Sequence, residues 1–264
     1  MRVLYTLPKS GHGGFVDMKS QLLALYVSAK VANLYFPKIV IYCNNWGSSQ
    51  LEKSDHDFSF AEIDTSLENC PYYDEAQWSI SKVFIYSLQK EPFIHCDIDA
   101  FMWGGIPEQF LEKRFIFQNF EPLTCNNYFF YRKTHEVAKR LGLLPDAVQI
   151  LPRNSFNMGI FGVLRKDDLY MMAEYWDASY DYIKRQQEFY KYTGIKENAT
   201  NNCMAEQLFV TSILDNNGVT EDDISTICDH QMNPKKDINY KHYTLNLKKS
   251  HDFINMLKAK LIEL

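Results

Sequence analysis

Two Asp-x-Asp motifs in the chain have the residue types that can hold a divalent cation. The first spans residues 55–57 in a polar stretch, where we expect a solvated loop. The second joins Asp97 and Asp99 and follows the apolar run at residues 93–96, which predicts a buried strand that ends at the acidic pair. Two carboxylates at low dielectric repel each other unless a cation or a proton offsets them. The second motif therefore predicts a site for a hard cation, Mn²⁺ or Mg²⁺, and an acid pair that caps a turn is the structural alternative.

A divalent cation at such a pair suits transfer from a donor that carries a diphosphate. The ion can bridge two phosphates and neutralise charge as a nucleoside diphosphate departs.

The first hundred residues alternate between strand and helix patterns, which indicates an α/β fold with a mostly parallel sheet. Strands are expected at 2–7, 38–43, 58–63 and 93–96, and helices at 18–34 and 75–89. Ligands of such sheets bind beyond the carboxyl ends of the strands, which is where the acidic pair falls.

The rest of the chain is less regular. Strands are expected at 114–120, 156–164 and 224–228, and helices at 131–141, 167–192, 203–215 and 251–264. The aromatic residues of 167–192 favour core packing over a sugar platform. We expect a single domain over 1–264, with a nucleotide-binding half (1–100), an acceptor and donor-sugar half (101–250) and a C-terminal amphipathic helix (251–264).

Composition excludes several classes of protein. The 264 residues hold 28 Lys+Arg against 33 Asp+Glu, and a formal net charge of −5 argues against a nucleic-acid binder. No apolar run is long enough for a membrane helix, and the first residues do not have the pattern of a signal peptide. Six cysteines without a CxxC pair favour reduced thiols and a cytoplasmic location.

Three further segments carry candidate ligands, each with a plainer alternative. The amide of Asn157 can bond sugar hydroxyls and Gly159 leaves room for a ring, although both also fit an ordinary strand. Glu206 precedes an apolar helical face, where a surface acid is common. A lone histidine such as His242 is often structural. Because Lys248 follows six residues later, a ligand role for His242 is an equally good interpretation.

Together these segments resemble the GT-A-fold glycosyltransferases with a DxD motif. Residues 93–99 are similar to the DxD strand of that fold, and 156–161, 205–208 and 242–248 keep the order found in the glycogenin and bacterial lipopolysaccharide galactosyl- and glucosyltransferase group. The resemblance implies a Rossmann-like GT-A fold with helices on both faces of the sheet. It also implies Mn²⁺- or Mg²⁺-dependent transfer of a sugar, a hexose, from a UDP-linked or similar donor to a saccharide or lipid-linked acceptor.

The resemblance assigns roles to individual residues. Implied metal ligands are Asp97, Asp99 and His242. Implied catalytic residues are Glu206, as base or orienting group, and Lys248, which would stabilise the departing diphosphate. Implied donor-binding residues are Tyr5, Thr6, Lys82, Asp97, Asn157, Gly159 and Gln207.

Residues 235–260 hold seven Lys and two Asp, a local excess of positive charge. A solvated face, a diphosphate clamp with Lys248 innermost and a weak contact with anionic lipid are all compatible with it. Where the resembled group has a Gly and a Pro-Trp pair, this chain has Leu245 and residues 249–250. A catalytically silent nucleotide-sugar-binding module therefore stays an alternative, as does a metal-dependent nucleotidyltransferase.

Overall fold

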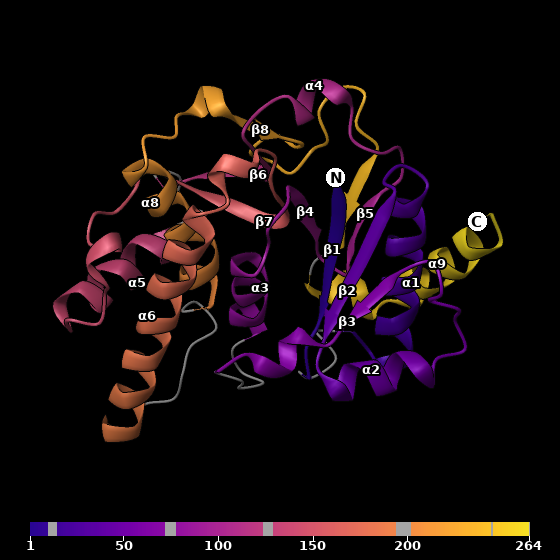
Figure 1. Ribbon diagram of the computed structural model, residues 1–264, viewed down its shortest axis with the longest axis horizontal. Coiled ribbons are helices and arrows are strands. Elements are labelled where there is room, and N and C mark those ends of the chain that lie inside the picture. Colours follow the sequence, from indigo (N-terminus) through magenta and orange to yellow (C-terminus); the bar gives the residue numbers. More distant parts are fainter. Residues whose placement is uncertain (10–14, 72–77, 124–128, 194–201, 244, 264) are drawn as a thin grey trace.

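The computed structural model describes residues 1–264 except 10–14, 72–77, 124–128, 194–201, 244 and 264. Within these residues, a seven-stranded sheet has the order β3-β2-β1-β4-β7-β6-β8, and β5 pairs with β9 in a small second sheet (Figure 1). The strands are β1 (Arg2–Leu7), β2 (Lys38–Cys43), β3 (Glu62–Asp64), β4 (Phe93–Cys96), β5 (Ala100–Met102), β6 (Phe115–Pro122), β7 (Asn154–Val163), β8 (Ile224–Thr226) and β9 (Tyr240–His242).

Helices lie on both sides of the sheet, with α1 and α9 on one side and α5, α6 and α8 on the other (Figure 1). Strands β3, β2, β1 and β4 run parallel, as do β6 and β8, while β7 is antiparallel to both of its neighbours. The predicted α/β fold with a mostly parallel sheet is confirmed. The helices are α1 (Met18–Asn33), α2 (Asn45–Glu52), α3 (Trp78–Ser87), α4 (Glu108–Leu111), α5 (Phe129–Arg140), α6 (Met171–Thr193), α8 (Phe209–Asn216) and α9 (His251–Glu263).

The apolar strands are buried on both faces. Val3, Tyr5 and Leu7 of β1 belong to the same core as residues of α1, whereas Leu4 packs in the core that contains α3 and α6. Strands buried on both faces read as nearly continuous apolar runs, because neither side of the pleat meets water. The run at residues 38–43 has this character for the same reason.

Two long-range strand pairings bring distant segments to the end of β4. In the antiparallel β4–β7 pair Cys96 lies opposite Ile160, and in the β5–β9 pair Ala100 lies opposite His242. The turn that joins β4 to β5 therefore sits between the middle of β7 and the end of β9.

The strand predicted at residues 58–63 is shorter in the structure, where β3 begins at Glu62. The Asp57 side chain accepts hydrogen bonds from the backbone nitrogen and the hydroxyl of Ser59, and Ala61 closes a turn on the Phe58 carbonyl. Side chains that bond nearby backbone groups compete with strand pairing. The motif at 55–57 thus lies in a loop, as predicted.

Other boundaries also differ from the sequence prediction. The helix expected at 203–215 contains a π-helical turn, Met204–Leu208, and continues as α8. The short helices α2 and α4 were not predicted; Asn44 caps α2 by accepting a hydrogen bond from the Gly47 nitrogen at 2.9 Å. The start of the helix expected at 75–89 lies outside the described residues. No disulfide bond links the cysteines that the structure describes.

The C-terminal helix α9 packs against the body of the protein. Its Phe253 and Leu257 are buried in a cluster with Phe101 and with residues of α1. The apolar side of α9 therefore packs into the core. In the described part of the chain, every helix is too short or too polar to traverse a bilayer.

We expect Leu257→Ala to lower the free energy of unfolding by about 2–5 kcal/mol, because it removes a core side chain and leaves a cavity. Ile262 on the same helix is 88% exposed, whereas Leu257 is fully buried, so Ile262→Ala should change stability by less than about 0.5 kcal/mol. Urea unfolding of the two variants measures the difference. Equal effects would show that α9 does not pack as described.

Candidate functional site

The acidic pair lies in the turn between β4 and β5. The Ala100 nitrogen donates to the Asp97 carbonyl at 3.0 Å, and the Asp97 nitrogen donates to the Gly159 carbonyl of β7 at the same distance. Asp99 is buried, while Asp97 is partly exposed. The end of the strand thus presents two carboxylates, one buried and one that solvent can reach.

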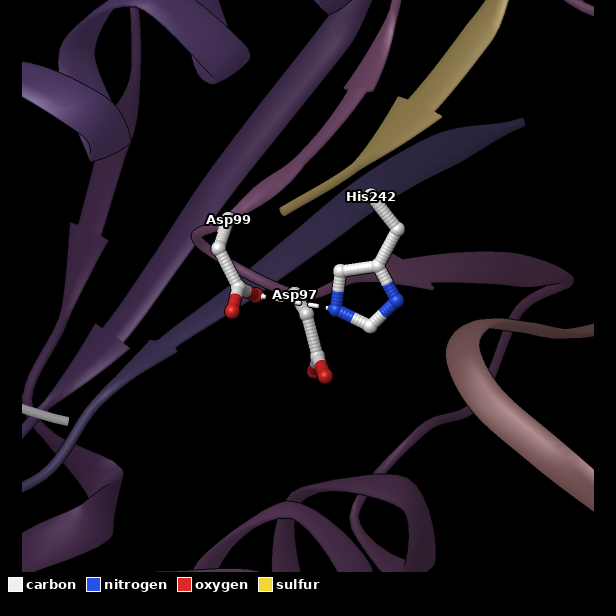
Figure 2. A group of neighbouring side chains, drawn as sticks. All are labelled: Asp97, Asp99 and His242. Atoms are coloured by element: carbon white, nitrogen blue, oxygen red, sulfur yellow. Dashed lines mark ion pairs between the residues drawn. The ribbon is translucent and has the colours of Figure 1, made fainter. Parts of the chain in front are cut away.

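His242, from the last strand of the chain, completes a group of three ligands. The Tyr243 nitrogen donates to the Asp99 carbonyl at 2.9 Å, which anchors β9 beside the acidic turn. His242 Nε2 lies 3.2 Å from Asp99 Oδ1, and one ligand atom each from Asp97, Asp99 and His242 fall within 4.8 Å of one another. Figure 2 shows the three side chains converging. Two carboxylate oxygens and an imidazole nitrogen form a donor set that Mn²⁺ accepts readily, whereas Mg²⁺ prefers oxygen alone.

Lysines neutralise the carboxylates in the structure. Lys248 Nζ lies 2.5 Å from Asp99 Oδ2. Lys82 Nζ lies 2.6 Å from Asp97 Oδ1 and 2.8 Å from Glu206 Oε1, so it bridges two acids. The repulsion that the sequence predicts between Asp97 and Asp99 is therefore offset by a separate ammonium group on each.

These ion pairs outweigh the effect of burial on the charged groups. Burial favours the neutral form of Asp99, but His242 and Lys248 together hold the pKa of Asp99 well below its usual range. Burial likewise opposes the charge on Lys82, yet Asp97 and Glu206 raise the pKa of Lys82 above its ordinary value. Asp99 is therefore a carboxylate and Lys82 an ammonium at neutral pH.

Glu206 is a buried acid with an altered affinity for protons. It lies in the π-helical turn before α8, and only 1% of its surface is exposed. Burial raises the pKa of Glu206 to about 7, although Lys82 partly opposes that shift. Its Oε2 has no hydrogen-bond partner within the part of the chain that the structure describes. The Tyr175 hydroxyl of α6 donates to the Glu206 carbonyl and helps to hold the turn.

Asn157 and Gln207 are linked through a further buried acid, Glu121, and through the hydroxyl of Tyr131. Asn157 Nδ2 donates to Glu121 Oε1 at 3.1 Å, and the Tyr131 hydroxyl donates to Glu121 Oε2 at 2.8 Å. The same hydroxyl contacts Gln207 Oε1. Asn157 Oδ1 also accepts from the Gly159 nitrogen at 3.0 Å. Polar groups of β6, β7, α5 and the π-helical turn thus form one network.

Gly159 is required by the side chains that pack on it. A Cβ at this position would lie 2.1 Å from Gln118 Oε1 and 2.7 Å from His242 Nδ1. Both separations are far below any normal contact, so only glycine lets the His242 ring approach β7. Its expected contact with a donor sugar stays a prediction.

The two candidates on β1 face opposite sides of the sheet. Tyr5 is buried towards α1, and its hydroxyl lies 3.0 Å from Ser28 Oγ, so its side chain is not brought to the acidic group. Thr6 points the other way, with Oγ1 at 3.2 Å from His95 Nε2. The His95 ring in turn has Nδ1 at 3.8 Å from Asp97 Oδ1. Thr6 thus reaches the site through His95.

The sequence prediction missed several residues that line this region. His95 had a usable signal, because residues two apart on a strand share a face and His95 precedes Asp97 by two. No such local signal marked Glu121, Gln118 and Tyr240, since they reach the site only through the pairing of β6 with β7 and of β5 with β9. Tyr131 reaches it from helix α5, again without a local signal.

A family model of unknown function, DUF6734, matches residues 6–263 of the sequence. The chain belongs to the DUF6734 family. A comparison with curated proteins finds no match.

Among solved structures, the DUF6734 chain is similar to several glycosyltransferases. The galactosyltransferase LgtC, in complex with donor and acceptor sugar analogues, is 7% identical with a TM-score of 0.48, over 100% of this chain and 96% of the other. Mouse xyloside xylosyltransferase 1 in its apo form is 13% identical with a TM-score of 0.38, over 86% and 84%. The glycosyltransferase GlyE of Streptococcus pneumoniae TIGR4 is 12% identical with a TM-score of 0.36, over 85% and 44%. Because these TM-scores are below 0.5, we base the function on the side chains of the chain itself.

We expect Glu206→Gln to remove a pH dependence of stability. The pKa of Glu206 is about 7 in the folded chain against 4.5 for a free side chain. Between these two values the folded state holds a proton that the unfolded state has released, so the free energy of unfolding falls as pH rises. The stability of the parent relative to Glu206→Gln should therefore decrease from pH 5 to pH 7.

Urea unfolding in buffer with a chelator measures this difference. Glu136, an exposed acid on α5, provides the control. The difference in the free energy of unfolding between the parent and Glu136→Gln should not change over the same pH range. If the difference in the free energy of unfolding between the parent and Glu206→Gln is constant with pH, the raised pKa of Glu206 is contradicted.

Proposed function

We propose that this DUF6734 chain is a GT-A-type glycosyltransferase that depends on Mn²⁺ or Mg²⁺. It would move a hexose from a nucleotide-diphosphate donor to a hydroxyl of a saccharide or lipid-linked acceptor. The donor would be a UDP-sugar. The observation that carries the proposal is the convergence of Asp97, Asp99 and His242 within 4.8 Å, with Lys248 on the same carboxylate as His242. Carboxylates, an imidazole and an ammonium at the end of a parallel strand suit a metal-bound diphosphate.

Asp97, Asp99 and His242 would hold the ion. When bound, it supplies Lewis-acid stabilisation of the charge that develops on the departing diphosphate. The ion pair between Lys82 and Asp97 keeps the more exposed carboxylate of the pair in place.

Lys248 fits a role at the diphosphate. Its ammonium lies on Asp99 Oδ2 at 2.5 Å and also 5.2 Å from the centre of the Phe15 ring. When a cation neutralises Asp99, Lys248 can pair with a phosphate oxygen instead. A positive group placed where negative charge develops lowers the barrier to departure of the nucleoside diphosphate.

The polar network beside the acids suits the sugar and the acceptor. Asn157, Gly159 and Gln207 would line the donor sugar, with Lys82 nearby. Glu206 Oε2, which has no hydrogen-bond partner among the described residues, could accept a hydrogen bond from a substrate hydroxyl. In an inverting reaction Glu206 would take the acceptor proton, for which a pKa near 7 is suited. In a retaining reaction the leaving phosphate would take that proton and Glu206 would orient the hydroxyl.

We expect UDP to raise the melting temperature of the protein only when Mn²⁺ is present. A ligand at a hundred times its Kd stabilises the folded state by about 2.7 kcal/mol, so the shift should be readily measured by differential scanning fluorimetry. Asp99→Asn should abolish the shift, because it removes a central carboxylate. Asp57→Asn, in the exposed acidic motif, should leave the shift unchanged.

The same preparations distinguish the reaction types. Release of UDP with transfer of sugar to an acceptor supports the proposal. Metal-dependent binding without any release identifies a silent nucleotide-sugar-binding module, and formation of pyrophosphate from a nucleoside triphosphate and a sugar phosphate identifies a nucleotidyltransferase. An Asp99→Asn variant that binds UDP with Mn²⁺ as tightly as the parent would remove Asp99 from the site.

We expect Lys248→Ala to weaken binding of UDP in the presence of Mn²⁺ by about tenfold to a hundredfold. A hydrogen bond to a charged group contributes about 1.5–3 kcal/mol, and a factor of ten corresponds to about 1.4 kcal/mol. UMP lacks the second phosphate, so its affinity should change much less. Lys249→Ala, at the exposed neighbouring position, is the matched control in the same calorimetric titration. Equal losses for UDP and UMP would place Lys248 away from the diphosphate.

A further inference from the structure

The His242 ring has two nitrogens with different partners. Nε2 lies 3.2 Å from Asp99 Oδ1, on the side of the candidate ligands. Nδ1 lies 2.9 Å from Oε1 of Gln118, a residue of β6 to which the sequence assigned no role. A neutral imidazole carries one proton, and only the nitrogen without it can bind a metal. Asp99 Oδ1 can accept a proton from Nε2 and Gln118 Oε1 can accept one from Nδ1, so a metal-binding Nε2 needs the acceptor at Nδ1.

Gln118 is held in a position that suits this task. It is fully buried, and it lies where the pairing of β6 with β7 shifts register between Phe117 and Asn119. A register shift of this kind re-aims a side chain relative to a regular strand. The Tyr240 hydroxyl donates to the same Gln118 Oε1 at 2.7 Å. The amide oxygen of Gln118 therefore contacts two side chains of β9, those of Tyr240 and His242.

The surroundings hold Gln118 through its oxygen. Among the described residues its Nε2 has no hydrogen-bond partner, so the contacts of the side chain are those of Oε1. Gly159 leaves the space that Oε1 occupies, because a Cβ there would lie 2.1 Å away. A neutral acceptor also adds no further charge to a region that already contains the buried Asp99 and Glu206.

We propose that Gln118 is a positioning residue that selects the Nδ1-protonated form of His242 and so directs the bare Nε2 at the metal. The inference rests on the proposed function for the presence of a metal, but it concerns this chain's own side chains. Groups that orient a metal-binding histidine through its other nitrogen typically change metal affinity about 10–100-fold when removed. Gln118→Met keeps the length and approximate volume of the side chain while it removes the acceptor.

The first test measures Mn²⁺ affinity by the electron paramagnetic resonance signal of free Mn²⁺, which needs no turnover. We expect Gln118→Met to weaken Mn²⁺ binding about 10–100-fold. In a His242→Gln background the same substitution should have almost no further effect, because residues that act through one another are not additive. A purely structural role would give equal losses in both backgrounds and overturn the proposal.

The second test does not depend on how any Gln118 variant folds. The parent protein is labelled with ¹⁵N-histidine, and the imidazole nitrogens are observed by NMR at pH 8 in the presence of Mg²⁺, a diamagnetic ion, with His242→Gln used to assign the signals. We expect the proton of His242 on Nδ1. A proton on Nε2 would overturn the proposal.

The two possible failures can be told apart. If the parent binds no Mn²⁺, the proposed function loses its metal and this inference falls with it. If the parent binds Mn²⁺ and Gln118→Met binds it equally well, Gln118 has no positioning role while the proposed function stands.

Discussion

Three buried or nearly buried carboxylates meet at one end of the sheet, and the arrangement around them keeps that charge tolerable. An unpaired charge away from water costs several kcal/mol. Lys82 bridges Asp97 and Glu206, and Lys248 pairs with Asp99. Each acid therefore has an ammonium partner from another element of the fold. The site can form only when α3, the β4–β5 turn, the π-helical turn and the C-terminal segment are all in place.

The topology of the sheet makes this meeting possible. Strand β7 runs antiparallel between β4 and β6, so its middle passes beside the end of β4. The chain then returns through β9, which pairs with β5 and places His242 opposite Ala100. Gly159 allows the close approach of the two segments, since any side chain there would displace the His242 ring. One glycine and two strand pairings thus position a ligand that is far from the acidic pair in sequence.

The balance of charge also bears on how a cation would enter. Because the ammonium of Lys248 already offsets Asp99, the carboxylate is stable in its charged form. If Asp97, Asp99 and His242 held a cation, that ion would take the place of the Lys248 ammonium at Asp99 Oδ2. This exchange would couple metal binding to the release of Lys248, which is the residue proposed to act on the diphosphate. Metal and nucleotide are then expected to bind cooperatively.

Local sequence patterns by themselves determined the alternation of strands and helices and the position of Asp97 and Asp99 at the end of a buried strand. They also separated this pair from the exposed motif at 55–57, because burial of the preceding strand is visible as an apolar run. The partners of these acids were decided only by the tertiary structure. Lys82 meets Glu206, and Gln118 meets His242, through contacts between segments more than a hundred residues apart. Periodicity reports which face of an element is buried, but it carries no information on which distant element packs there.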